Sequence, residues 1–176
     1  LRETAHEYGF KEIRTPIFER TELLIRGVGE SSDIVTKEMY TFLDRGERSM
    51  TLRPEGTAPV IRAFVEKKLY AQPGTHKFFY RGPMFRYARP QAGRYRQHHQ
   101  FGDEAIGNSS PEQDVEMIDM VSEIYRRLGL KNLTVQINSV GDTESRIAYK
   151  KALTVFLQPH FESLSPDSQI RFSKNI

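Results

Sequence analysis

Arginine side chains gather around one turn of the sequence. Within positions 86–96, the chain places Arg86, Arg89, Arg94 and Arg96 on either side of Pro90-Gln91-Ala92-Gly93. A guanidinium is a planar fork of donors that matches phosphate oxygens, so these side chains could clamp a triphosphate. A solvated basic loop and a nucleic-acid-binding patch are the alternatives. Because the stretch lacks the glycine pattern of a P-loop, a nucleotide would be held by side chains rather than by a helix N-terminus.

Two carboxylates lie at the ends of apolar segments. Glu55 follows Leu52-Arg53-Pro54, and Glu104 follows Gln100-Phe101-Gly102-Asp103. Inside a cleft, these carboxylates would bind ammonium or imidazole groups, whereas on the surface they would be solvated charges. His98 and His99 do not form a predicted metal pair, because adjacent residues of a strand point to opposite faces and no third ligand has a useful spacing. We therefore predict no metal site.

The arginine-rich turn needs two strands to hold it. Apolar and aromatic patterning predicts antiparallel strands over Lys77–Arg86 and Gln97–Ile106. If this hairpin turns about residues 91–93, the numbers of paired positions sum to 184, because 91 + 93 = 184. Arg81 would then lie opposite Asp103, and the two charges would form a stabilising cross-strand pair.

The remaining elements follow from periodicity and from turn residues. We expect helices over residues 1–9, 18–28, 56–68, 110–128, 142–157 and 167–174, and strands over residues 10–16, 39–44, 49–54 and 133–141. Ser110 and Gln113 would form a capping box at the start of the helix that follows them. Helices and strands mix without a regular βαβ repeat, so the sequence predicts an α+β fold with an antiparallel sheet flanked by helices.

Composition excludes several classes of protein. The chain is 38% apolar and includes 11 Phe and 8 Tyr, which is enough for a core and argues against wholesale disorder. It has no Cys, which excludes disulfides, thiolate metal sites and a cysteine nucleophile. Its apolar runs are far shorter than the ~20 residues of a membrane span, and no signal peptide is visible, so we expect a cytoplasmic protein. The net charge of +3 permits an anionic partner without requiring one.

Four segments resemble histidyl-tRNA synthetase, a class II aminoacyl-tRNA synthetase. HEYGFKEIRTP (6–16) looks like motif 1 with Pro16 as the motif proline, and GPMFRYARPQAGRYRQHHQFG (82–102) looks like motif 2 with its loop. TLRPEGT (51–57) is similar to the amino-acid-binding segment of the family, and INSVGD (137–142) to the strand and turn that come later. The resemblance covers essentially the whole chain, and it implies a six-stranded antiparallel sheet with flanking helices.

The resemblance also implies an activity. Histidine and ATP, which arrives with Mg²⁺, would form histidyl-adenylate, and the histidyl group would then pass to tRNA. Arg86 matches the catalytic motif 2 arginine that holds the ATP α-phosphate and the histidine carboxylate. Arg94 matches a loop arginine that binds the outer phosphates, and Gln100 is also assigned to the ATP site. The histidine pocket would combine Arg86 and Gln100 with Glu55, Gly56, Thr57, Tyr95 and Glu104.

The chain differs from the family pattern in content and in length. Ala88 stands where motif 2 usually has a glutamate that helps to seat the adenine, and Arg81, His98 and Asp103 stand where less polar residues are more common. The family's histidine-specific arginine-tyrosine segment, motif 3 and anticodon-binding domain are absent from the 176 residues. We therefore interpret residues 1–176 as part of a class II catalytic domain that carries motifs 1 and 2, and we expect a homodimer through residues 1–16.

Two other interpretations stay open from the sequence. A non-catalytic relative of the synthetase that senses histidine would keep Glu55, Gln100 and Glu104 while its nucleotide site degenerates, as at Ala88. The intact GRYRQ stretch (93–97) argues against this interpretation, because such relatives usually lose it. An engineered scaffold fragment would also combine a short chain with unusual substitutions.

Overall fold

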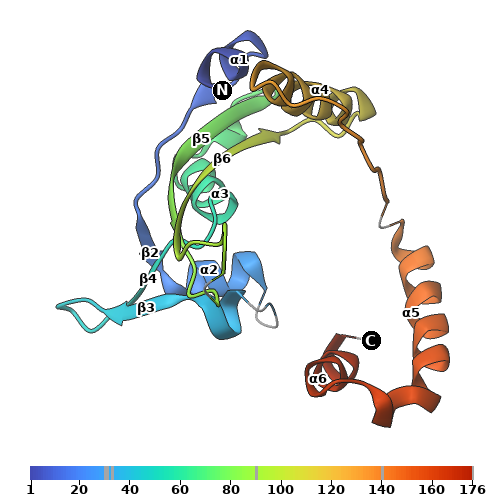
Figure 1. The fold of residues 1–176 in the computed structure, drawn as a ribbon. Coiled ribbons are helices and arrows are strands. Elements are labelled where there is room, and N and C mark those ends of the chain that lie inside the picture. Colours follow the sequence, from blue (N-terminus) through green and yellow to red (C-terminus); the bar gives the residue numbers. More distant parts are fainter. Residues whose placement is uncertain (30–31, 33, 90, 140, 176) are drawn as a thin grey trace. The chain divides into compact units, whose positions relative to one another are not determined.

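The computed structural model describes residues 1–29, 32, 34–89, 91–139 and 141–175. The chain forms two compact units, residues 1–133 and residues 134–176 (Figure 1). The first unit carries every residue that the sequence places in the candidate site. Within the described residues, its framework consists of two three-stranded sheets.

The first sheet is built around a long hairpin. Strands β5 (His76–Phe85) and β6 (Gln97–Ile106) pair antiparallel, within one residue of the predicted bounds. The short strand β1 (Lys11–Glu12) pairs parallel to β5. The strand predicted over residues 10–16 is thus shorter than expected, because the chain leaves the sheet after the Ile13 amide bonds to a β5 carbonyl at 2.9 Å.

The register of the hairpin differs from the prediction by two residues. Paired positions sum to 182 rather than 184, so Arg81 lies opposite Phe101. The loop is the cause: the Arg86 amide donates to the Arg96 carbonyl at 2.8 Å, whereas the turn closes over residues 91–94. The limb of the loop that runs from β5 to this turn is longer than the limb that runs from the turn to β6. The assumption of a symmetric turn is therefore wrong. Pro90, at the predicted centre of the loop, lies outside the described residues.

The predicted ion pair between Arg81 and Asp103 is consequently wrong. Arg81 instead approaches Glu12 of β1, with 4.0 Å between Nε and Oε1. Asp103 lies opposite Phe79, which belongs to the buried core. In the described part of the chain, no hydrogen bond or ion pair satisfies the Asp103 carboxylate, and burial raises its pKa.

The second sheet has the order β2-β4-β3 and is antiparallel throughout. Its strands β3 (Tyr40–Leu43) and β4 (Ser49–Leu52) confirm the predicted hairpin. The helix predicted over residues 18–28 begins three residues late, because β2 (Phe18–Arg20) pairs with β4 and leaves α2 (Thr21–Val28) to follow. The fold is α+β as predicted, but the described residues form two small sheets rather than one of six strands. Short helical turns, η1 (Ile34–Glu38) and η2 (Leu69–Ala71), precede β3 and β5.

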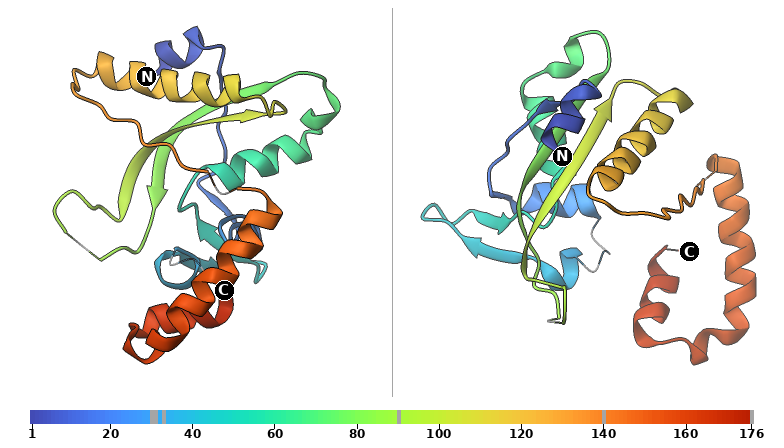
Figure 2. Two further views of the ribbon diagram at one scale, coloured as in Figure 1. Left: turned by 90° about the vertical axis from the view of Figure 1, so that its right-hand side faces the viewer. Right: turned by 45° about the horizontal axis from the view of Figure 1, so that its top comes forward.

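Helices pack on both faces of the β5–β6 hairpin (Figure 2). On one face, Phe79 joins α1 (Arg2–Glu7) and α4 (Pro111–Arg127) in a core of Ala5, Phe10, Phe79, Met120 and Ile124. On the other face, Tyr80 and Met84 pack with Val60 of α3 (Thr57–Glu66). Successive residues of a strand point to opposite faces, so the neighbours Phe79 and Tyr80 anchor two separate cores.

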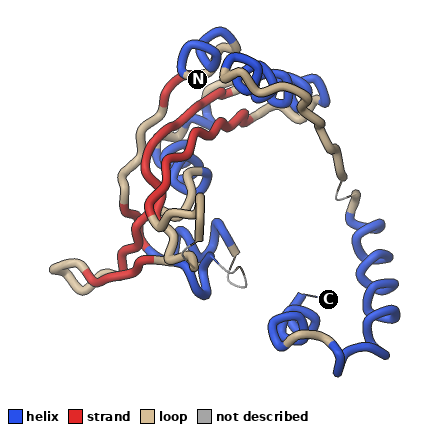
Figure 3. Tube along the Cα trace, in the orientation of Figure 1, coloured by secondary structure: helices blue, strands red, loops and turns tan. Residues whose placement is uncertain are grey.

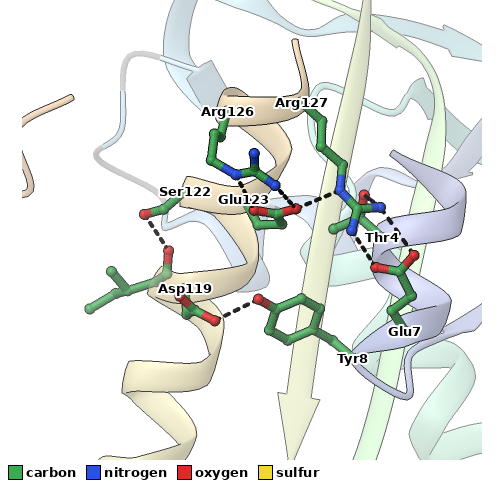
Figure 4. A network of polar contacts seen from close by, with 9 residues as sticks. Thr4, Glu7, Tyr8, Asp119, Ser122, Glu123, Arg126 and Arg127 are labelled. Atoms are coloured by element: carbon green, nitrogen blue, oxygen red, sulfur yellow. Dashed lines mark hydrogen bonds and ion pairs between the residues drawn. The ribbon is translucent and has the colours of Figure 1, made fainter. Parts of the chain in front are cut away.

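Polar contacts join α1 to α4 beside the apolar core (Figure 4). Arg127 donates to Glu7 Oε2 at 2.6 Å and to Thr4 Oγ1 at 3.2 Å. The Tyr8 hydroxyl donates to the Asp119 carboxylate at 2.5 Å, and this bond raises the pKa of Tyr8 to about 12. The two helices therefore cover their face of the hairpin as one layer.

The capping box predicted at the start of α4 is not formed. Ser110 occupies the N-cap position, but its side chain makes no cap hydrogen bond. The side chain of Gln113, which is buried, donates instead to Glu116 Oε2 at 2.5 Å, while Lys77 binds the other oxygen of Glu116 at 2.6 Å. This network with β5 replaces the local cap.

The second unit is helical. It contains α5 (Thr143–Leu157), η3 (Gln158–Ser163) and α6 (Pro166–Asn175), and the Asp142 carboxylate caps α5 by accepting from the Ser145 amide at 2.7 Å. The strand predicted over residues 133–141 is wrong, since the described part of this segment is irregular chain (Figure 3). Its apolar alternation finds no neighbouring strand among the described residues with which to form a ladder. Val140 lies outside the described residues.

Replacing Asp103 with Val is expected to raise the free energy of unfolding at neutral pH by about 1 kcal/mol, because it removes a desolvated and unpaired carboxylate. The raised pKa means that the folded state favours protonated Asp103. The stability that protonated Asp103 gives the folded state is fully present below the pKa of this group in the unfolded chain. It is lost as the pH rises through the pKa of Asp103 in the folded state. The advantage of Asp103→Val should therefore grow from acid to neutral pH. Urea unfolding at both pH values, with Asp103→Asn as the isosteric comparison, measures this, and a Val variant that is less stable at neutral pH would contradict it.

Candidate nucleotide and amino-acid site

Arg86 lies at the end of β5 and turns back toward the segment that follows β4. Its Nε donates to the Pro54 carbonyl at 2.8 Å. The arginine predicted to bind phosphate is therefore held next to Glu55, which is predicted to bind an amino group. His98 lies opposite Met84 on the neighbouring strand. Burial, and then the positive charge of Arg86, lower the pKa of His98.

Arg53 is a buried arginine that the sequence did not single out. Its side chain is 7% exposed and bonds to main-chain carbonyls, with 3.0 Å from Nε to Pro83 and 3.0 Å from Nη1 to Thr15. A Cβ on Gly82 would approach Arg53 Nη2 to 2.6 Å, so this glycine leaves room for the guanidinium. The sequence could have indicated this role, because Arg53 lies between Leu52 and Pro54 at the end of an apolar strand. A cation is rarely buried there without fixed partners.

Glu55 caps α3. Its two carboxylate oxygens accept from the amides of Thr57 at 2.6 Å and Ala58 at 3.0 Å. These are amides of the first helical turn, which have no partner within the helix, and a negative charge is favourable at this end of the helix dipole. Glu55 is therefore fixed in place, and it in turn fixes Thr57.

Thr57, Tyr80 and Glu104 meet on the α3 face of the hairpin. The Thr57 side chain interacts with both the Tyr80 hydroxyl and the Glu104 carboxylate. Burial raises the pKa of Glu104, and burial raises the pKa of Tyr80 to about 12. Gln100 and Glu104 share this face with Tyr80, because they lie opposite Gly82 and Phe78 in the register.

The Tyr80 ring fits between two glycines. A Cβ on Gly56 or on Gly102 would overlap the ring, so both positions must lack a side chain for the ring to lie here. Tyr80 itself is 6% exposed. The sequence predicted Gly56 as part of the pocket but missed Tyr80, whose place depends on the register of the hairpin.

The arginine-rich loop has a different set of contacts. Arg94 Nη2 lies 3.3 Å from Glu38 Oε1, the guanidinium of Arg96 lies 3.9 Å from the centre of the Tyr87 ring, and Ala88 is buried. Tyr95 is 71% exposed, and within the described part of the chain no hydrogen bond or ring contact joins its side chain to the other predicted residues. The predicted site thus divides into a compact group around Arg86, Glu55, Thr57 and Glu104, and a loop that carries Arg94.

A hollow of 360 Å³ adjoins the compact group. It is lined by Glu55, by Thr57 and Ile61 of α3, and by Leu23 and Arg26 of α2. Polar groups beside a partly apolar hollow suit a small ligand that carries both kinds of surface. Among the described residues, no group of three or more His, Asp or Glu side chains is arranged to hold a metal ion.

Comparison with known families identifies the chain. The family model for histidyl-tRNA synthetase matches residues 1–147. The chain belongs to the histidyl-tRNA synthetase family. The histidine–tRNA ligase of Protochlamydia amoebophila is 61% identical over 175 residues, and that of Desulfitobacterium hafniense is 59% identical over 175 residues. Each alignment covers 99% of this chain and 41% of the relative, so the chain spans about two fifths of the length of these ligases.

Solved structures of the histidyl-tRNA synthetase family agree with the fold. Apo histidyl-tRNA synthetase from S. aureus is 45% identical to this chain, has a TM-score of 0.78, and aligns over 98% of this chain and 40% of its own. A protein from Bacillus halodurans described as an ATP phosphoribosyltransferase regulatory subunit/histidyl-tRNA synthetase is 24% identical with a TM-score of 0.67, and supports the fold alone. None of the helices in the described part of the chain is long and apolar enough to cross a membrane.

Gly102→Ala is expected to lower the free energy of unfolding by about 1–3 kcal/mol, because the new methyl group overlaps the buried Tyr80 ring. Gly46→Ala is the matched control, since the nearest atom to its Cβ would be 3.4 Å away in an exposed turn. Chemical denaturation of both variants measures the difference. Adding Tyr80→Leu to Gly102→Ala should recover part of the loss, and equal effects of the two glycine substitutions would contradict the packing argument.

Proposed function

We propose that this chain is the ATP- and histidine-binding part of a histidine–tRNA ligase. The observation that carries the proposal is the bond from Arg86 to the Pro54 carbonyl, which sets a phosphate-binding guanidinium beside the Glu55-Gly56-Thr57 segment. The family membership and the identity to curated histidine–tRNA ligases support the same assignment. The cytoplasm, where tRNA is charged, is the proposed location.

The proposed reaction is an in-line displacement at the α-phosphorus of ATP. The histidine carboxylate attacks, a P–O bond to the attacking oxygen forms, and the bond to pyrophosphate breaks. Arg86 would bind the α-phosphate and the histidine carboxylate and stabilise the charge that develops between them. Arg94 would bind the outer phosphates, with Gln100 beside the nucleotide. Mg²⁺ would enter with ATP, bound mainly by phosphate oxygens and water.

The histidine substrate would be recognised by carboxylates on the α3 face. Glu55 and Glu104 offer acceptors for an ammonium group and an imidazole N–H. Thr57 contacts both carboxylates, Glu55 through its amide and Glu104 through its side chain. Tyr95 would line the pocket from the loop. The histidyl group would then pass to tRNA in the complete protein.

Arg86→Ala should weaken ATP binding by about 2–3 kcal/mol, roughly 30- to 160-fold, because a charge-assisted hydrogen bond is lost. Arg86→Lys should recover only part of the affinity, since lysine lacks the planar fork. Calorimetric titration of this chain with ATP measures both, with Arg45→Ala in the exposed β3–β4 turn as control. Unchanged affinity in Arg86→Ala would refute the role. Histidine binding without ATP–pyrophosphate exchange in the complete protein would favour a histidine sensor instead.

We also propose a homodimer through residues 1–16 and the two apolar residues that follow them. Ile17 and Phe18 are 45% and 51% exposed, and adjacent apolar side chains of this kind favour burial against a partner. Sedimentation at micromolar concentration should give the mass of a dimer, and Phe18→Asp should shift it to the monomer. Val115→Asp, at an exposed position on α4, should leave the dimer intact. A monomer at high micromolar concentration would contradict the proposal.

A further inference from the structure

Glu38 holds both limbs of the arginine-rich loop. It is the last residue of η1, two positions before β3 begins at Tyr40. Its main-chain carbonyl accepts from the Tyr87 amide at 2.8 Å, on the limb that leaves β5. Its carboxylate accepts from Arg94 Nη2 at 3.3 Å, on the limb that returns to β6. One residue from outside the hairpin thus contacts the loop on both sides of its turn.

Ring contacts strengthen this attachment. The Tyr40 ring meets the Tyr87 ring edge-on, with 5.5 Å between centroids, and Arg96 lies over the Tyr87 ring at 3.9 Å. The Arg94 amide bonds to the Gln91 carbonyl at 3.0 Å, which closes the tip of the loop. The loop is therefore docked on the η1–β3 junction, and Arg94 is docked with it.

We propose that Glu38 is a positioning residue that docks Arg94 in the nucleotide-free protein and competes with the outer phosphates of a nucleoside triphosphate for its guanidinium. The inference rests on the proposed function, in which Arg94 binds those phosphates. Carboxylate and phosphate oxygens bind the same donors of arginine, so Arg94 exchanges one anion for the other. A nucleoside monophosphate has no outer phosphates and leaves the docked pair in place.

The solvent exposure of the pair fits an exchange. The Glu38 side chain is 16% exposed, whereas the Arg94 side chain is 50% exposed on the loop. Ion pairs open to water are weak, so a triphosphate with several charges can displace this one. In the proposed exchange, the more exposed Arg94 side chain moves to the phosphates and the Glu38 carboxylate keeps its place.

The test compares Glu38→Gln with Glu7→Gln, which removes the same charge from an Arg–Glu pair between α1 and α4. In the nucleotide-free protein, trypsin should cleave after Arg94 several-fold faster in Glu38→Gln than in wild type; cleavage after Arg89 is blocked by the following proline. ATP should bind Glu38→Gln about two- to fivefold more tightly than wild type, and AMP with unchanged affinity. Glu7→Gln should match wild type in all three measurements.

A second variant separates competition from a general loss of negative charge. In an Arg94→Gln background, Glu38→Gln should no longer change the affinity for ATP, because the contested guanidinium is absent. Equal ATP affinity of wild type and Glu38→Gln, an equal gain for AMP, or an undiminished effect in the Arg94→Gln background would each overturn the inference while the proposed function stands. If wild type binds no ATP, the proposed function fails for this chain, and the inference fails with it.

Discussion

The guanidinium of Arg53 is the contact on which the geometry of the site depends. It is a buried cation that donates to the carbonyl oxygens of Pro83, Thr15 and Pro16 and to the Thr15 hydroxyl, and so joins two segments far apart in the sequence. Burial lowers the pKa of Arg53, and the charge of Glu19 opposes this. The main chain of Arg53 adds bonds to Ile17 at 2.8 Å and Phe85 at 3.0 Å, so one residue joins the segment after β1, the strand β5 and the end of β4.

The positions of Arg86 and Glu55 in the compact group depend on this junction. Pro54 comes directly after Arg53 and supplies the carbonyl that receives Arg86, and Glu55 comes next and caps α3. Arg86 and Glu55, which we propose to bind phosphate and an amino group, are therefore only a few bonds away from the same buried anchor. Groups that must act on two ends of one small substrate gain from such rigidity, because a shift of about 1 Å is costly for a reaction that relies on positioning.

The sequence predicted what depends on local pattern and missed what depends on distant contacts. The β5–β6 hairpin, the β3–β4 hairpin and most helices were predicted because strand patterning, turn residues and helical periodicity are local signals. The predicted pairing of Arg81 with Asp103 is wrong, because the two limbs of the loop differ in length. Residue types identified Arg86 and Glu55 as candidates. Arg53 contacts residues 15 and 83, and Glu38 contacts residue 94. These partners lie far apart in the sequence, so no local pattern predicts the contacts.

The Tyr80 ring ties three positions of the sequence together. Because the ring fills the space that side chains at Gly56 and Gly102 would need, neither glycine can gain a side chain without a loss of stability while the ring is present. A smaller residue at position 80 would leave a void that only new side chains at the other two positions could fill. In a set of variants selected for folding, these three positions should therefore covary as a group. Substitutions chosen one position at a time would miss combinations in which the three positions change together.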